Sequence, residues 1–415
     1  MAELSWLTAA PQRGKKWQKV AGNVRILSFI IRWARSRSNQ HGKTGELDGL
    51  IGGEGPMTRM RLFAGASIVM TSLAVCVCGQ GWDHAISLFN QKQYRPAIRE
   101  FHAVLRDNPG YWQAWYYIGY SHFQLKDYED SIDSFQRYIK SAAGQEKEQA
   151  SGDYFVGFAY YELKQYDKSI PALSQYCSIM ERLREKVEPT ARAALGRAYI
   201  FTNRFAEAVN ALTQAAAEMK TNANNYYYIG FAQHKLVHED LAVLALNRAL
   251  EIDAKDPDSL SLLGDIYLGQ SKKNPAAAKQ AIQVGERLAT VRDDEHSWAL
   301  LGQAYLIDQQ YAKAAPPLEK FARAHTDSGP AWFNLGLALS RSEQWKPAEN
   351  ALEQAVKLVP ANGPAQLELG YVYEKDKQYD KALAAYQRAY QISGNRDETA
   401  QASIDRVKQT LQQKE

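Results

Sequence analysis

The chain has 415 residues, of which 45% are hydrophobic and 23% are charged, and this composition disfavours a wholly disordered chain and a multi-span membrane protein. The net charge of +4 arises before residue 80, because residues 80–415 carry slightly more acidic than basic side chains. A slightly acidic body disfavours a nucleic-acid-binding protein, which needs a basic excess to neutralise phosphates. Cys177 is the single cysteine after residue 80, so that region has no internal disulfide framework.

Residues 1–56 precede a second methionine, Met57, and two interpretations stay open for them. In the preferred one they are disordered or not translated, because the codons for Gly52–Gly55 can spell a bacterial ribosome-binding sequence ahead of a start at Met57. This interpretation predicts a bacterial protein. In the other, Lys15–Arg37 is a basic amphipathic helix that lies on a membrane or targets an organelle.

Residues 57–79 have the pattern of an export signal. Arg59 and Arg61 precede an uncharged, largely apolar run, Leu62–Gly79, and cleavage before Gln80 is expected. An uncleaved anchor stays open, because the run would span about 27 Å as a helix, and a lipoprotein signal at Cys76 is a weaker third option. In each case we expect the body to lie outside the cytoplasm, periplasmic, secreted or anchored. Membrane contact is expected only through residues 62–79, if they are uncleaved.

From residue 80 onward, small residues recur in two ladders at spacings of about 34 to 39 residues. Around them, apolar residues follow a helical period over 112–125 and again over 127–139, with a Lys-Asp turn between the two segments. Each unit is therefore predicted to be a helix, a tight turn and a second helix. The first ladder is Ala85, Gly119, Gly157, Gly196, Gly230, Gly264, Gly302, Gly336 and Gly370, and the second is Ala97, Ser131, Ser169, Ala208, Ala242, Ala278, Ala314, Ala348 and Ala382.

The units resemble the tetratricopeptide repeat, whose pattern places Trp, Leu, Gly and Tyr on the first helix and Ala and Pro later. One unit has Trp298, Leu301, Gly302 and Tyr305 in this order, and the next has Trp332, Leu335 and Gly336 followed by Ala348 and Pro360. The resemblance implies an all-α, right-handed superhelical solenoid of about nine units over residues 80–394. First helices would line a concave groove and second helices a convex back. Residues 395–415 are predicted to form a capping helix and tail.

The sequence offers no convincing catalytic motif, so we predict a non-enzymatic protein without cofactor or metal. His234 and His238 have the spacing of two metal ligands on one helix face. The preferred interpretation is that His234 faces the groove and His238 ends a first helix. Cys177 has no fixed base nearby in the sequence, and it is predicted to be a packed core residue rather than a nucleophile.

Aromatic residues fall into two sets. The first lies three residues before the second ladder and is predicted to close the inter-helix turns: Tyr94, Tyr128, Tyr166, Phe205, Tyr311, Trp345 and Tyr379. The second occupies positions that the resemblance assigns to the groove, with packing as the alternative role for several of them. It comprises Tyr116, Tyr120, Phe123, Tyr154, Phe158, Tyr161, Phe201, Tyr227 and Phe231, together with His234.

These features predict a protein–protein interaction scaffold of the cell envelope that binds an apolar segment of a partner protein in the groove. Two alternatives stay open: a glycan-binding module, since rings also stack on sugars, and an accessory subunit of an envelope enzyme complex. The Lys/Asn/Arg arrangement that clamps a C-terminal carboxylate in some members of the family does not occur, which disfavours a chaperone-tail receptor.

Overall fold

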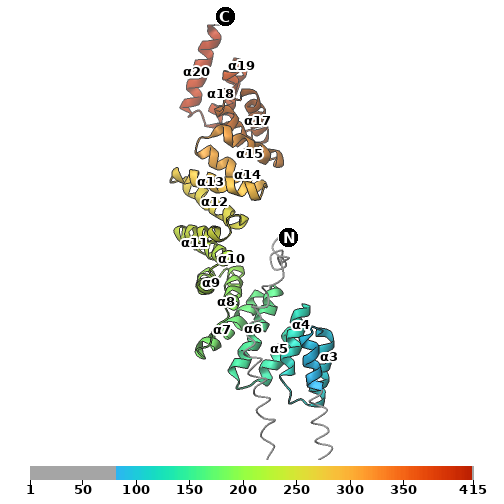
Figure 1. Cartoon of the computed structure of the whole chain (residues 1–415). Coiled ribbons are helices and arrows are strands. Elements are labelled where there is room, and N and C mark those ends of the chain that lie inside the picture. The colour runs from blue at the N-terminus through green and yellow to red at the C-terminus, as the bar shows by residue number, and fades with distance from the viewer. Residues whose placement is uncertain (1–80, 414–415) are drawn as a thin grey trace, which may run out of the picture. The chain divides into compact units, whose positions relative to one another are not determined.

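Helices form along the whole described part of the chain, as the helical period of the apolar residues predicts. The computed structural model describes residues 81–413, and these residues form helices joined by short turns, with no strand among them (Figure 1). The predicted all-α solenoid of helix pairs is confirmed for this part of the chain. The predictions for residues 1–56 and 57–79 lie outside the described residues.

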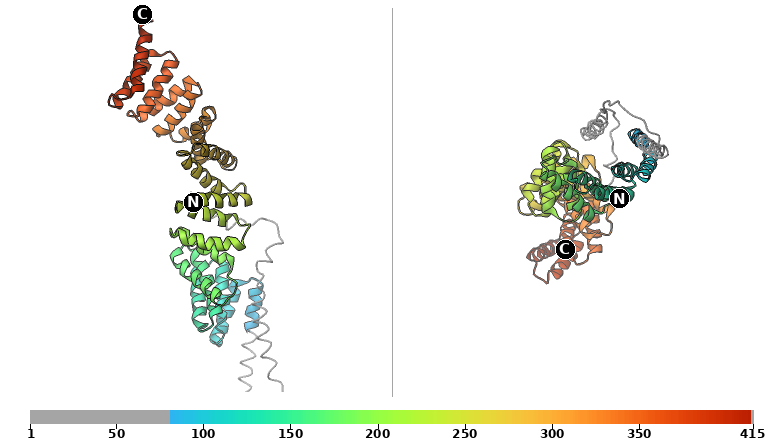
Figure 2. Two further views of the ribbon diagram at one scale, coloured as in Figure 1. Left: turned by 90° about the vertical axis from the view of Figure 1, so that its left-hand side faces the viewer. Right: turned by 90° about the horizontal axis from the view of Figure 1, so that it is seen from below.

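Within residues 81–413 the helices form nine pairs, here called units one to nine, and a final single helix (Figures 1 and 2). The first helices are residues 81–90, α4 (Ala114–Leu125), α6 (Glu146–Glu162), α8 (Pro189–Phe201), α10 (Ala223–Lys235), α12 (Pro257–Ser271), α14 (Glu295–Ile307), α16 (Gly329–Arg341) and α18 (Gly363–Lys375). The second helices are α3 (Tyr94–Asp107), α5 (Tyr128–Ser141), α7 (Tyr166–Arg182), α9 (Phe205–Glu218), α11 (Glu239–Ile252), α13 (Ala276–Val291), α15 (Tyr311–Ala324), α17 (Trp345–Leu358) and α19 (Tyr379–Ile392). The single helix is α20 (Glu398–Gln412).

Packing proceeds from neighbour to neighbour. Each labelled helix packs against the one before it and the one after it, so every unit buries its apolar face against the next. From α4 to α12 each first helix also contacts the following first helix, as do α12 with α14 and α16 with α18, whereas second helices make no comparable contacts with one another in the described residues. The first helices therefore approach one another more closely than the second helices do, as expected for the inner side of a solenoid.

The glycine ladder marks the closest approach of the paired helices. A Cβ atom at Gly336 would lie 2.5 Å from Cγ of Leu352, and one at Gly302 would lie 2.6 Å from Cδ2 of Leu318. Every residue of the second ladder is fully buried. In unit two the two ladders are bonded directly, because the hydroxyl of Ser131 donates to the carbonyl of Gly119 at 2.9 Å. Small residues are thus required where the helices touch.

The turn between paired helices has a left-handed residue just after the first helix. In unit two this is Lys126, with φ 65°, and the amide of Asp127 donates to the carbonyl of His122 at 2.9 Å, which satisfies a free carbonyl at the helix end. The predicted turn-closing rings are confirmed as the first residues of the second helices. They are Tyr94, Tyr128, Tyr166, Phe205, Tyr311, Trp345 and Tyr379.

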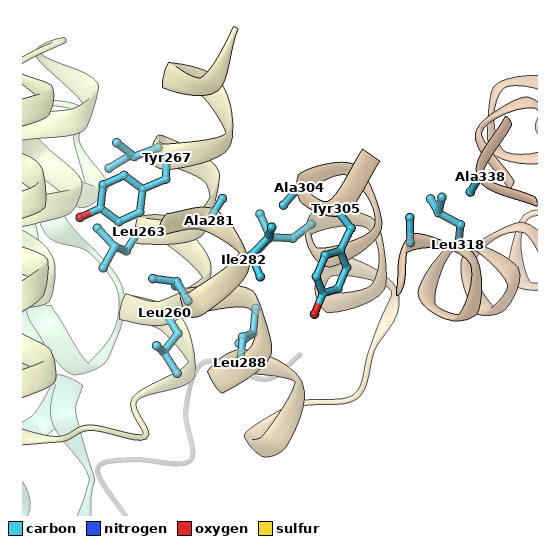
Figure 3. Close-up of a cluster of buried hydrophobic side chains, with 14 of the residues drawn as sticks. Leu260, Leu263, Tyr267, Ala281, Ile282, Leu288, Ala304, Tyr305, Leu318 and Ala338 are labelled. Atoms are coloured by element: carbon cyan, nitrogen blue, oxygen red, sulfur yellow. The ribbon is translucent and has the colours of Figure 1, made fainter. Parts of the chain in front are cut away.

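The largest core cluster runs through units five to eight (Figure 3). Unit six carries an insertion around Lys272–Pro275 and departs from the other units: a Cβ at Gly264 would lie 2.5 Å from Cδ2 of Leu300, which belongs to the next unit. Accordingly, α12 contacts α14 directly as well as its own partner helix. The insertions of units two and three are absorbed differently, because they lengthen α6 and α7.

The final helix, α20, packs on the last helix pair. Ile404 and Val407 on α20 are buried against α19, where Tyr386 is almost completely buried. Its N-terminus is capped by the Asp397 side chain, which accepts from the amide of Ala400. No helix among residues 81–413 is both long enough and apolar enough to span a membrane.

Candidate functional site

The ten predicted groove residues lie on the first helices of units two to five and are here called the aromatic surface. Nine of them are half-buried, and Phe201 is 41% exposed. Contacts between them and the next first helix place them on the side where first helices meet: the hydroxyl of Tyr154 on α6 lies 3.4 Å from that of Thr190 on α8. Likewise, the Arg197 guanidinium on α8 donates from Nε to the hydroxyl of Tyr161 on α6 at 3.1 Å.

Phe155 joins the rings of units two and three into one cluster. Its ring stacks on that of Phe135 with centroids 4.8 Å apart, and it contacts Tyr120 and Phe123 edge-on at 5.5 and 5.7 Å. It also touches Tyr154, whose ring lies 4.7 Å from that of Phe158. Sequence reasoning missed Phe155 because the groove pattern assigns the neighbouring Tyr154. The signal was present as two consecutive aromatic residues on a helix.

Packing dominates the role of Tyr116. Its ring lies 5.4 Å from that of Tyr138 and 5.7 Å from that of Phe135, and burial raises the pKa of its hydroxyl well above the usual range. Burial also raises the pKa of the hydroxyls of Tyr120 and Tyr154. The ring of Phe158 contacts one other ring among the described residues, that of Tyr154. Phe158 also packs against the core of the third unit, so Phe201, at 41% exposed, is the least buried member of the aromatic surface.

The remaining rings form two smaller clusters rather than extending the first. In one, Tyr166 stacks on Phe201 at 4.5 Å and contacts Tyr161 at 5.5 Å. In the other, Phe231 lies 6.4 Å from both Tyr227 and Phe205. Tyr166 and Phe205 were predicted to close turns, and here they also support the aromatic surface. The structure thus groups the predicted rings into three patches in sequence along units two to five.

Units six to nine present a different surface, on which charged groups are neutralised within the chain. Arg292 pairs with Asp258 at 3.4 Å, and the Arg341 guanidinium pairs with Glu368 at 2.8 Å. Arg341 and Lys375 also lie over the ring of Tyr371 at 5.5 and 5.3 Å. Most of the polar groups available there are therefore already engaged in internal contacts.

A family model matches two parts of the described chain. The model described as tetratricopeptide repeat matches residues 83–146 and 333–397, in units one and two and in units eight and nine. These two segments match the tetratricopeptide repeat. The units between the matched segments share the helix pairing and the buried ladders. Such repeats generally bind protein partners and are typically non-catalytic.

Solved structures of other repeat proteins are similar to parts of the chain. YrrB, a TPR protein with an unusual peptide-binding site, is 19% identical over 48% of this chain and 99% of its own, with a TM-score of 0.43. The C-terminal part of a TPR repeat-containing protein from Cytophaga hutchinsonii is 17% identical over 60% of this chain and 99% of its own, also with a TM-score of 0.43. MamA (AMB-1) is 25% identical over 42% and 94%, with a TM-score of 0.37. No curated protein matches the chain.

The histidine pair of unit five is not arranged as a metal site. His234 ends the row of the aromatic surface, and its Nδ1 lies 3.0 Å from Oε2 of Glu239. The prediction that His238 ends the first helix is wrong: α10 ends at Lys235, and His238 directly precedes α11, with its Nδ1 3.0 Å from the Gln233 side chain. In residues 81–413 no group of three or more His, Cys, Asp or Glu is placed to hold a metal ion.

Cys177 lies in the core of the third repeat, 8% exposed, among Leu173, Tyr176 and Ile179. Burial raises the pKa of its thiol to about 11. The prediction of a packed residue is confirmed by this position, because a nucleophile needs an exposed, readily ionised thiol.

A shallow hollow of about 370 Å³ lies at the turn between α14 and α15 and reaches α16. Its two cations are already in contact with other groups, Lys313 with the ring of Tyr305 and Arg341 with Glu368. It therefore offers less free chemistry than the aromatic surface.

Proposed function

We propose that this protein is an interaction scaffold that holds an apolar segment of a partner protein against the aromatic surface of repeats two to five. The observation that carries the proposal is the gathering of half-buried rings on first helices, where consecutive repeats meet. Aromatic side chains offer a large contact area and lose little entropy on binding, so they are frequent at the centre of protein interfaces. A groove lined by such rings suits an extended or helical apolar peptide.

The charge distribution supports contact area, rather than electrostatic attraction, as the source of affinity. Few charged groups belong to the ring patches, and those beside them are engaged: Arg197 with Tyr161, and Lys235 over the ring of Phe231 at 5.3 Å. In repeats six to nine several charges are paired internally, as Arg341 is with Glu368. A strongly charged partner would find little to complement on either surface.

Selection from a random peptide library tests this proposal with a defined probe. We expect selected peptides to be rich in Leu, Ile, Met and Phe. We expect Tyr120→Ala combined with Phe158→Ala to weaken binding of a labelled selected peptide by about tenfold or more. Phe201→Ala alone should weaken binding with no effect on the fold, because that ring is the most exposed of the set. Circular dichroism of each variant checks that the helical content is unchanged.

Phe333→Ala and Tyr371→Ala are the controls in repeats eight and nine. Tyr371 occupies the position that corresponds to Tyr120 and Phe158, and Phe333 occupies the one that corresponds to Tyr116 and Tyr154. Unchanged peptide binding by the Tyr120/Phe158 variant, with binding lost in either control, would place the binding surface in the C-terminal repeats and overturn the assignment. Binding on a glycan array, abolished by Phe158→Ala, would instead favour the glycan-binding alternative.

We further infer that the repeats function outside the cytoplasm, delivered by residues 57–79 as a signal peptide or an anchor. Two measurements test this inference. Alkaline phosphatase, which is active only after export, is fused after residue 82 in a bacterial host, and activity is expected. The N-terminal peptide of the native protein is identified by mass spectrometry, and a start at Gln80 is expected after cleavage. A peptide from residues 1–56 would contradict the interpretation that this segment is not translated.

A further inference from the structure

The outer face of α11 carries apolar side chains with nothing packed on them. Val237 in the preceding turn is 77% exposed, and Leu241 and Leu244 on the helix are 50% and 69% exposed. Leu241 and Leu244 lie one helical turn apart and share a face with the exposed Arg248. Val237, Leu241 and Leu244 are here called the α11 stripe.

Other repeats show that the architecture does not require apolar residues there. Counted from the buried ladder, the position of Leu244 is taken in other second helices by Arg99, Asp133, Pro171, Asn210, Gln280, Pro316, Asn350 and Ala384. The position of Leu241 is taken by Pro96, Asp130, Lys168, Glu207, Ala277, Lys313, Pro347 and Lys381. Large apolar side chains occupy these outer positions in the fifth repeat alone.

The turn before α11 also has an apolar residue, Val237, where other repeats have polar residues. Val237 has a positive φ of 63°, a left-handed conformation that is unfavourable for a β-branched residue. Other repeats place Lys92, Lys126, Lys164, Asn203, Gln309, Glu343 and Lys377 at the same turn position, and each of these is polar. Other repeats form the same turn with polar residues, and Val237 adds backbone strain to it. We therefore look to a contact with another molecule for the role of this valine.

A second copy of the chain is the occupant that the charges of this face favour. When two α11 helices pair in opposite directions about a twofold axis between Leu241 and Leu244, Leu241 of each copy meets Leu244 of the other. Asp240 and Arg248, both exposed on this face, then lie near each other across the axis. A parallel arrangement would bring like charges together. Arg248 is engaged only at the surface, with Glu251 at 2.5 Å and over the ring of Tyr226 at 5.8 Å.

We propose that the α11 stripe is a self-association surface, at which two copies of this chain pair through antiparallel α11 helices. Three side chains from each copy bury far less than the roughly 800 Å² per partner of a standard stable interface, so the association is weak and depends on concentration. The surface belongs to second helices and uses no member of the aromatic surface. Self-association therefore goes beyond the proposed function, and each of the two proposals can fail without the other.

Sedimentation velocity of the full chain from micromolar to near-millimolar concentration tests the proposal. The parent should show an average sedimentation coefficient that rises with concentration, and Leu241→Glu with Leu244→Glu should remain monomeric throughout. Asn210→Glu changes the corresponding outer position of repeat four and should associate as the parent does. A parent that stays monomeric, or association that persists in the double glutamate variant, would overturn the proposal.

Charge reversal tests the antiparallel arrangement separately. Asp240→Arg or Arg248→Asp alone should weaken association, because each places like charges across the axis. The two changes together in one chain should restore it, since the opposite charges then meet again with their roles exchanged. Failure of the combined variant to recover would show that the copies do not pair as described.

Discussion

At residue 336 the absence of a side chain is what allows α16 and α17 to touch. We expect Gly336→Leu to lower the free energy of unfolding by about 1–3 kcal/mol or more, because a Cβ there would already lie 2.5 Å from Leu352. The control is Gly269→Leu, since a Cβ at this exposed position on α12 meets nothing within 4 Å. That change should be neutral or stabilising, because leucine favours a helix more than glycine does. Denaturant melts of both variants measure the contrast, and equal stability of Gly336→Leu and the parent would invalidate the register.

Asp153 stands where repeats two, seven and eight have tryptophan, and burial raises the pKa of its carboxyl from 3.8 to about 6. The folded state thus binds more protons than the unfolded state between these values, and this group makes stability fall as pH rises through that window. We expect Asp153→Asn to raise the melting temperature above about pH 6 and to leave it nearly unchanged near pH 4. The same increment at both pH values would show that the effect is not due to ionisation.

At the scale of the element, α20 is held to α18 by one forked ion pair. Arg406 donates from Nε and Nη2 to the two carboxylate oxygens of Glu374 at 2.8 Å each, and Tyr386 donates its hydroxyl to the same carboxylate. This pairing lowers the pKa of Glu374, so its stabilisation is present above the unfolded pKa of about 4.5 and is lost as pH falls through the folded value.

We expect Arg406→Ala to cost about 1 kcal/mol, because the pair is partly exposed, and to increase amide hydrogen exchange in α20 more than elsewhere. Arg388→Ala is the control, since that arginine contacts only Gln391 at 3.4 Å, and it should leave exchange in α20 unchanged. If amide exchange in α20 is equally fast in both variants and in the parent, the forked pair does not hold α20 in place.

At the scale of the whole molecule, the helices of residues 81–413 make nearly all their contacts with neighbouring helices and, among first helices, with the next first helix. Stability in such an array is a sum of local terms rather than a property of one core. We therefore expect Gly336→Leu to speed amide exchange in repeats seven to nine while repeats two to four exchange as in the parent. Hydrogen exchange followed by mass spectrometry measures this, and an equal loss of protection in all repeats would contradict the nearest-neighbour description.

The parts that could be predicted from sequence are those set by local spacing. The positions of Gly336 and Ala348 predicted the helix pair and its contact, because both depend only on helical period and turn length. The contact of Gly264 with Leu300 could not be predicted, since it depends on how unit six accommodates its insertion. Phe155 was missed because the repeat pattern gives one groove residue at that turn. The bond between Arg406 and Glu374 could not be predicted either, because it joins the final helix α20 to a residue 32 positions earlier in the ninth repeat.

The buried thiol of Cys177 can report how often the helices of the third repeat separate. With a pKa of about 11 and 8% exposure, it stays protonated and shielded near neutral pH, so a thiol reagent should modify it only when the surrounding helices separate. The rate of its modification would then report how often this part of the array opens. A ligand that binds the aromatic surface across α6 and α8 should slow that rate, so the modification rate of Cys177 would report how much of the surface is occupied.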